Sequence, residues 1–153
     1  LGFLTLLLLF AVWLVLSHRV PLKMLPFDNK NELQVVVDMP EGTTLEKTEA
    51  AVYAMANYLV RVPEVTDVTT WTGTSSPMDF NGLVRHYYLR QGANVADIRF
   101  NFIGKKYRSQ QSHAIGLRLR NDLKAIAERY GANIKIVESP PGPPVISTLV
   151  AEV

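Results

Sequence analysis

Residues 32–62 read ELQVVVDMPEGTTLEKTEAAVYAMANYLVRV, and this stretch decides the fold. Its first part, Glu32 to Met39, alternates between apolar and polar side chains, as a strand with one buried face does. The apolar side carries Leu33, Val35 and Val37, and the other side carries Gln34 and Asp38. The pattern predicts a half-buried strand over residues 32–39.

A helix is predicted directly after this strand. The turn PEGTT follows the strand, and Thr43 with Glu46 has the spacing of a capping box, which marks the start of a helix. Apolar residues then recur at helical spacing until Pro63, which cannot continue a helix. The predicted apolar stripe is Leu45, Val52, Met55, Leu59 and Val62.

The rest of the domain repeats this order of elements. We expect strands over Val65–Trp71, Val95–Ile103 and Ala132–Val137, a long and mostly irregular segment over Thr72–Asn94, and a helix over about Gln110–Tyr130. The apolar stripe of this helix is Ile115, Leu119, Leu123, Ile126 and Tyr130, and Gly131 ends it. The third predicted strand alternates Ile98, Phe100 and Phe102 with Asp97, Arg99 and Asn101.

Strand, helix, strand, strand, helix, strand is the order of a split βαβ, or ferredoxin-like, α+β fold. Such a fold has a four-stranded antiparallel sheet with both helices on one face. The sheet must turn its apolar side to the helices, so Ile98, Phe100 and Phe102 are predicted to be core residues. Gln34, Arg99, Asn101 and Lys135 are then predicted on the other side. Many unrelated proteins share this fold, so it does not by itself indicate a function.

The chain begins with an uncharged apolar run, LGFLTLLLLFAVWLVL, at Leu1–Leu16. It is apolar on every face, which is typical of membrane helices, but a full span needs about 20 residues. We therefore expect residues 1–19 to be the C-terminal part of a transmembrane helix. A signal peptide and a buried core helix are the alternatives. The net charge of +2 and the scattered basic residues give no indication of nucleic-acid binding, and without cysteine there are no disulfides or thiolate metal sites.

Five features occur in order along the chain: the linker Leu25-Pro26-Phe27, Met39-Pro40, Glu41-Gly42-Thr43-Thr44, Pro63-Glu64-Val65, and SPPGPPVISTLVAEV at 139–153. In this order the sequence resembles the resistance-nodulation-division (RND) efflux permeases of the hydrophobe/multidrug type. The matching region is the start of the second large periplasmic loop of these proteins. The resemblance covers essentially the whole chain.

The resemblance implies a division into a membrane helix (1–19), a linker (20–30), a porter subdomain (31–139), and a Pro-rich break leading into the next subdomain (140–153). Family members are proton-driven homotrimers of the bacterial inner membrane that work with a periplasmic adaptor and an outer-membrane channel. They contact membrane lipid, carry small molecules, and need no cofactor, metal or nucleic acid. Residues from about 20 onward would lie in the periplasm, although Arg19 and Lys23 would favour the cytoplasm by the positive-inside rule. The proton relay would lie outside the chain, because no ionisable residue occurs in 1–16.

The family's switch loop corresponds to residues 72–90, with Trp71 at its base. The resemblance and the exposed polar face together give these candidate substrate-path residues: Trp71, Met78, Phe80, Leu83, Arg99 and Asn101. An equally good alternative is that three of these residues attach the loop to its own domain or pack on a neighbouring subdomain: Met78, Phe80 and Leu83. The polar face departs from the aromatic pocket of the multidrug branch, which leaves the substrate class open. A metal-exporting relative is an alternative suggested by Met39 and Met78, although 132–153 contains no third methionine.

Two other classes of function remain as alternatives to the transporter. One is a membrane-anchored, ferredoxin-like sensor or adaptor domain. The other is an enzyme, but no nucleophile elbow or P-loop is present, and His86 and His113 have no partner at metal-ligand spacing.

Overall fold

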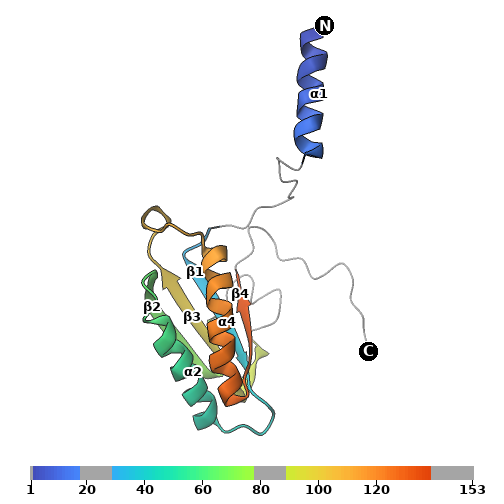
Figure 1. Cartoon of the computed structure of the whole chain (residues 1–153). Helices are drawn as coiled ribbons and strands as arrows, with labels where there is room; N and C mark the ends of the chain where they lie inside the picture. Colours follow the sequence, from blue (N-terminus) through green and yellow to red (C-terminus); the bar gives the residue numbers. More distant parts are fainter. Residues whose placement is uncertain (1, 18–28, 78–88, 139–153) are drawn as a thin grey trace, which may run out of the picture.

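The computed structural model describes residues 2–17, 29–77 and 89–138. Its elements are α1 (Gly2–Leu16), β1 (Glu32–Asp38), α2 (Leu45–Leu59), β2 (Val65–Thr74), β3 (Gln91–Phe102), the short 3₁₀ helix η2 (Lys105–Tyr107), α4 (Ser112–Tyr130) and β4 (Asn133–Val137). The strands form one four-stranded antiparallel sheet in the order β2-β3-β1-β4. Both α2 and α4 lie on the same side of this sheet (Figure 1). The predicted α+β, split βαβ fold is confirmed.

The two long-range pairings of β1 bring the halves of the domain together. Val35 of β1 lies opposite Ile98 of β3 on one side and opposite Ile136 of β4 on the other. Since β1 is an inner strand of the sheet, its side chains can be buried on both faces, which explains the three consecutive valines at 35–37. Leu33 lies opposite Phe100, so the two predicted apolar strand faces are in register.

The hydrophobic core lies between the sheet and the two helices. The predicted core residues Ile98, Phe100 and Phe102 are all buried, and the rings of Phe100 and Phe102 meet edge to face at 5.4 Å. The helices contribute the stripes expected from their spacing; their buried members include Val52, Met55, Leu59, Ile115, Leu119 and Leu123. Phe100 and Phe102 are therefore packed inside the domain, and they do not form an accessible aromatic pocket.

The start of α2 differs from the prediction. Thr44 is the N-cap residue, and no side chain caps the helix. The capping box of Thr43 with Glu46 was wrong because the Thr43 hydroxyl donates to the carbonyl oxygen of Pro40 instead, at 2.7 Å. Leu45 was assigned to the buried stripe but is exposed. At the end of α4, Gly131 has φ of 73°, the left-handed conformation that favours glycine, and it ends the helix as predicted.

The segment between β2 and β3 is shorter than expected. β2 continues to Thr74 and β3 begins at Gln91, whereas residues 72–94 were expected to be mostly loop. Residues 78–88, residues 20–28 of the predicted linker (20–30) and the predicted start of the next subdomain at 140–153 lie outside the described residues.

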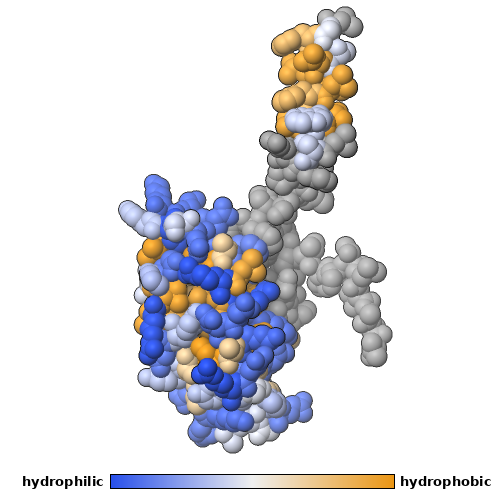
Figure 2. Space-filling model, viewed as in Figure 1, coloured by the Kyte–Doolittle hydropathy of each residue, from blue (hydrophilic) through white to orange (hydrophobic). Residues whose placement is uncertain are grey.

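The first helix is strongly apolar. Its large side chains from Phe3 to Trp13 are exposed, and Figure 2 shows it as predominantly hydrophobic, while the helix-covered side of the domain is mainly hydrophilic. Over the ranges 2–17, 29–77 and 89–138, no helix has the length and hydropathy needed to cross a bilayer. The assignment of residues 1–19 to a membrane helix stays a prediction.

Candidate functional site

The candidate site lies on the far face of the sheet, the side away from α2 and α4. The strand register places the side chain of Asp97 in β3 on this face, between Val36 of β1 and Trp71 of β2. Arg99 follows two residues later and lies between Gln34 and Thr69. The alternation of the sequence placed these polar residues on the correct face.

Asp97 is at the centre of the site and is completely buried, with 0% of its surface exposed. A buried carboxylate needs several donors to offset the loss of water. Asp97 has three: the guanidinium of Arg90 at 2.8 Å, the backbone N–H of Ser76 at 2.7 Å, and the side-chain amide of Gln34 at 3.2 Å. Gln34 is only 6% exposed, so the far face of the sheet is covered at this point.

Arg90 extends the site toward β1. Besides Asp97, its guanidinium donates to the carboxylate of Asp38 and to the carbonyl oxygen of Val37, the latter at 2.8 Å. Lys135 of β4 adds a longer ion pair with Asp38 at 3.7 Å. One arginine therefore connects β3 with the end of β1 through charge-assisted hydrogen bonds, which are stronger than neutral ones.

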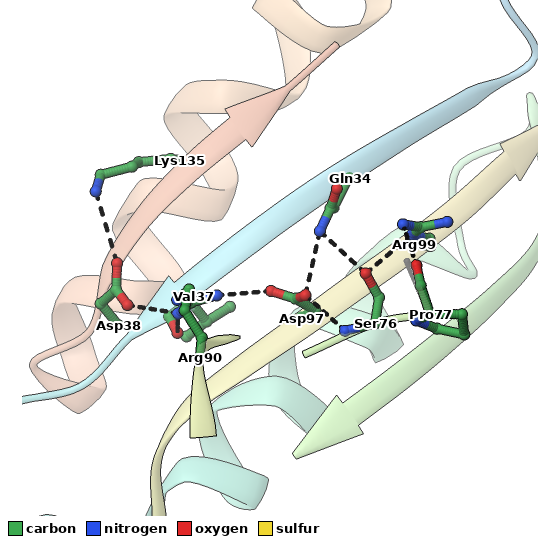
Figure 3. A network of polar contacts seen from close by, with 9 residues as sticks. All are labelled: Gln34, Val37, Asp38, Ser76, Pro77, Arg90, Asp97, Arg99 and Lys135. Carbon is green, nitrogen blue, oxygen red and sulfur yellow. Dashed lines mark hydrogen bonds and ion pairs between the residues drawn. The ribbon is translucent and has the colours of Figure 1, made fainter. Parts of the chain in front are cut away.

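Arg99 extends the site in the other direction. Its Nε donates to the hydroxyl of Ser76 at 3.1 Å, and its Nη2 donates to the carbonyl oxygen of Pro77 at 2.9 Å. It also forms an ion pair with Glu32 at 3.4 Å. Figure 3 shows the resulting chain of contacts across the strands. We call these six residues the loop-anchor network: Gln34, Asp38, Ser76, Arg90, Asp97 and Arg99.

The network attaches both ends of one segment to the sheet. Ser76 and Pro77 immediately precede residues 78–88, and Arg90 follows them. Asp97 accepts a hydrogen bond from each end, through Ser76 and through Arg90. The same buried carboxylate therefore holds a described residue on either side of residues 78–88.

The structure separates the predicted substrate-path residues. Trp71 is half-buried on β2 opposite Asp97, and Arg99 belongs to the loop-anchor network. Asn101 is exposed and donates to Asp67 at 2.7 Å, outside the network. The other three predicted residues, Met78, Phe80 and Leu83, lie outside the described residues. A role in a substrate path stays a prediction for all six.

Sequence reasoning missed the three residues that matter most in the network: Asp97, Arg90 and Ser76. Asp97 was placed on the polar side of its strand, but its burial was not predicted. The available signal was the position of this carboxylate near the middle of a strand, where neighbouring residues can cover a side chain. Nothing in the sequence indicated that Ser76 and Arg90 would both reach it.

Two groups with shifted pKa values lie outside the network. Burial, then the hydrogen bond and charge of Asp122, raises the pKa of Tyr58 to about 12. Burial opposes ionisation of Glu64, but the hydrogen bond from Arg118, a backbone hydrogen bond and the charge of Arg118 outweigh it. The pKa of Glu64 is therefore lowered. These pairs join α4 to α2 and to the start of β2.

Other possible sites fit the predictions less well. A groove of about 600 Å³ runs between α4 and β4, and its lining, which includes Lys124, Ala132 and Ile134, contains none of the six predicted residues. Met39 is buried in the hydrophobic core, so its thioether is not presented to a metal ion. Among the residues that the structure describes, no three His, Asp or Glu side chains gather in a possible metal site.

The sheet and its network define a ferredoxin-like α+β domain in which Asp97 of β3 binds Ser76, which follows β2, and Arg90, which precedes β3. The model of the AcrB/AcrD/AcrF family matches residues 2–141, and the chain therefore belongs to this family of RND-type transporters. No curated protein matches the chain. A solved structure described as an amidohydrolase/peptidase from Burkholderia cenocepacia is 11% identical, with a TM-score of 0.37. That match covers 71% of this chain and 27% of the other protein, and a similarity this low carries no argument about function.

Proposed function

We propose that the chain is a porter subdomain of a proton-driven RND efflux permease of the hydrophobe/multidrug type, and that it lines part of the path taken by exported small molecules. Membership of the AcrB/AcrD/AcrF family supports the transporter class. The observation that carries the role of this domain is the loop-anchor network, in which buried Asp97 accepts hydrogen bonds from Ser76 and Arg90, on either side of residues 78–88.

In this proposal the intact permease is a homotrimer in the bacterial inner membrane and works with a periplasmic adaptor and an outer-membrane channel. Residues 1–19 end a membrane helix, and the residues from about 20 onward lie in the periplasm. Proton flow elsewhere in the permease drives the movement of the subdomain. The chain itself catalyses no bond chemistry.

The physical reason for anchoring the loop is transmission of movement. A segment whose ends are attached by buried ionic hydrogen bonds must move with its sheet, because releasing it would leave a carboxylate and a guanidinium unpaired in a poorly solvated place. Close-packed domains move as rigid bodies and do not deform continuously. Movement of the subdomain would therefore carry residues 78–88, with Met78, Phe80 and Leu83, toward or away from the substrate.

The test uses the complete permease that contains this chain, expressed in a bacterium that lacks its own efflux pumps. Asp97→Asn and Arg90→Gln should each lower the export of a fluorescent dye several-fold, with unchanged amounts of permease in the membrane. Arg120→Gln, on the exposed side of α4, is the matched control and should export normally. Normal export by both network variants would contradict the proposed role of the network. If cells with the unaltered permease accumulated as much dye as the empty host, transport of this class of molecule would be contradicted.

A further inference from the structure

A short basic turn follows β3 at the end of the domain where β1 begins. Residues 105–108 read Lys-Lys-Tyr-Arg, and the first three form η2. Tyr107 is 83% exposed, the highest value among the large exposed apolar and aromatic side chains of the described residues. Lys105 and Lys106 are exposed and form no ion pair with any residue that the structure describes. The turn therefore exposes an aromatic ring beside two lysines whose charges no described residue neutralises.

Arg108 fixes this basic turn to the place where the domain starts. Its Nη2 donates to the side-chain oxygen of Asn29 at 3.0 Å, to that of Asn31 at 2.9 Å, and to the carbonyl oxygen of Lys30 at 3.3 Å. Its guanidinium also lies 5.0 Å from the centre of the Phe102 ring. Lys30 and Lys105 line one open groove of about 480 Å³. The basic turn and Lys30 thus form one rigid surface.

This surface lies close along the chain to the apolar helix α1. Residues 18–28 separate Ser17 from Asn29, and a fully extended chain of that length spans at most about 40 Å. The same stretch contains two basic residues, Arg19 and Lys23, and one acidic residue, Asp28. Of the acidic residues at this end of the sheet, Glu32 pairs with Arg99, whereas Asp67 accepts only from the neutral groups of Asn101 and Thr66 among the described residues and keeps its negative charge. The three exposed lysines, Lys30, Lys105 and Lys106, outnumber this carboxylate, so the surface stays cationic.

We propose that Lys30, Lys105, Lys106 and Tyr107 form a surface that contacts the anionic phospholipid headgroups of the bilayer that holds α1. The proposal rests on the membrane placement of α1 given under the proposed function, and it is independent of transport. Ammonium groups are attracted to the phosphates of an anionic membrane, and tyrosine suits the interface because its ring is apolar and its hydroxyl is polar. The contact would set how the domain stands on the membrane.

The geometry favours a lipid surface over a free phosphate ion. A phosphate ion is bound most specifically by a planar guanidinium. The guanidinium of Arg108 is not accessible to one, because its Nη2 is hydrogen-bonded within the protein and its Nε and Nη1 are buried. The exposed groups that remain are point charges on flexible stems beside an exposed aromatic ring. That combination matches a broad anionic interface with an apolar layer beneath it.

The experiment uses the full chain, which contains no cysteine, so a single introduced cysteine labels one position. A fluorophore on Ser109→Cys reports the basic turn, and one on Glu41→Cys reports the opposite end of β1. Each protein is placed in lipid nanodiscs of phosphatidylcholine, alone or with about one-third phosphatidylglycerol, that carry a headgroup quencher. Co-elution with the discs reports insertion of α1 separately.

We expect strong quenching at position 109 in the anionic discs and little at position 41. Lys105→Gln with Lys106→Gln should lower the quenching at 109 by about half or more, whereas the matched pair Lys47→Gln with Lys124→Gln should not. Equal quenching at both positions, or quenching that ignores phosphatidylglycerol, overturns the surface while leaving the proposed function intact. Quenching that free glycerol phosphate abolishes would identify a soluble phosphate as the ligand and overturn the lipid proposal. A chain that does not enter the discs overturns the membrane placement of α1, and this proposal with it.

Discussion

The two faces of the sheet are both buried over part of their area, but by different kinds of side chain. The face under α2 and α4 is covered by aliphatic and aromatic contacts, with Phe100 near its centre. The far face is covered by polar partners, with Asp97 near its centre. Phe100 and Asp97 are both 0% exposed, although they lie three residues apart on one strand.

This difference indicates that one face contributes stability and the other contributes fixed geometry. Apolar burial is not directional and stabilises in proportion to the area removed from water. Buried hydrogen bonds contribute only about 1 kcal/mol each in net stability but impose strict geometry, because an unpaired group is costly. The helix-covered face therefore holds the domain together, and the far face determines where the ends of residues 78–88 lie.

The largest expected effect is on the helix-covered face. Phe100→Ala should lower the free energy of unfolding by about 3–5 kcal/mol, because it removes a large buried ring and leaves a cavity. Urea unfolding of the full chain in detergent, followed by circular dichroism, measures it. Tyr53→Ala, an exposed aromatic on α2, is the control and should change stability little. A loss below about 1 kcal/mol for Phe100→Ala would mean that the core is not organised around this ring.

The next effect concerns the far face and should be smaller but more local. Asp97→Asn should lower the free energy of unfolding by about 2 kcal/mol. Arg90 loses its buried anion, and the amide –NH₂ replaces one carboxylate oxygen that accepted a hydrogen bond. Hydrogen exchange at the Ser76 amide, which donates to Asp97, should accelerate far more than exchange in α4. Glu49→Gln on the exposed side of α2 is the charge-matched control. Uniform acceleration throughout the domain would remove the distinction between the two faces.

The sequence predicted the helix-covered face well because one rule governs it. Alternation in the strands and helical spacing in α2 and α4 both place apolar side chains toward a single layer, as Ile98 and Leu119 show. The errors arose where local hydrogen bonds compete. The Thr43 hydroxyl donates to the carbonyl oxygen of Pro40 and does not cap the helix, and the same sequence is compatible with both arrangements.

The far face could be predicted only in part. Alternation placed Asp97 and Arg99 on it, but burial of Asp97 depends on Ser76, which is 21 residues away, and on Arg90, which precedes the strand. Irregular segments carry no periodicity from which their path can be inferred. For the same reason, Trp71 and Asn101 were grouped with the site, although the side chain of Asn101 donates to Asp67, outside the network.

A third prediction concerns pH at the rim of the helix-covered face. The pKa of Glu64 is lowered in the folded domain, so the unfolded chain binds more protons at acidic pH. Its ion pair with Arg118 therefore stabilises the fold above the unfolded pKa, about 4.3, and the contribution is lost as pH falls through the lower, folded value. Glu64→Gln should remove this part of the acid dependence and lower stability at neutral pH by less than about 1 kcal/mol. Identical stability–pH profiles for both proteins between pH 3 and 6 would contradict it.

The smallest expected effect tests whether burial, and not the ion pair as such, distinguishes the far face. Lys124 and Glu128 form an ion pair at 3.8 Å with side chains 67% and 65% exposed, whereas the Arg90–Asp97 pair is 18% and 0% exposed. Exposed pairs one helical turn apart contribute about 0.5 kcal/mol or less. Lys124→Gln should therefore lower stability by no more than that, and moderate salt should erase the difference, since water screens exposed charges. Arg90→Gln should lower stability by about 2 kcal/mol or more, largely independent of salt, because it leaves Asp97 buried without its cation. If the two variants lost the same stability with the same salt dependence, the far face would be an ordinary charged surface, and Asp97 would not be what fixes residues 78–88.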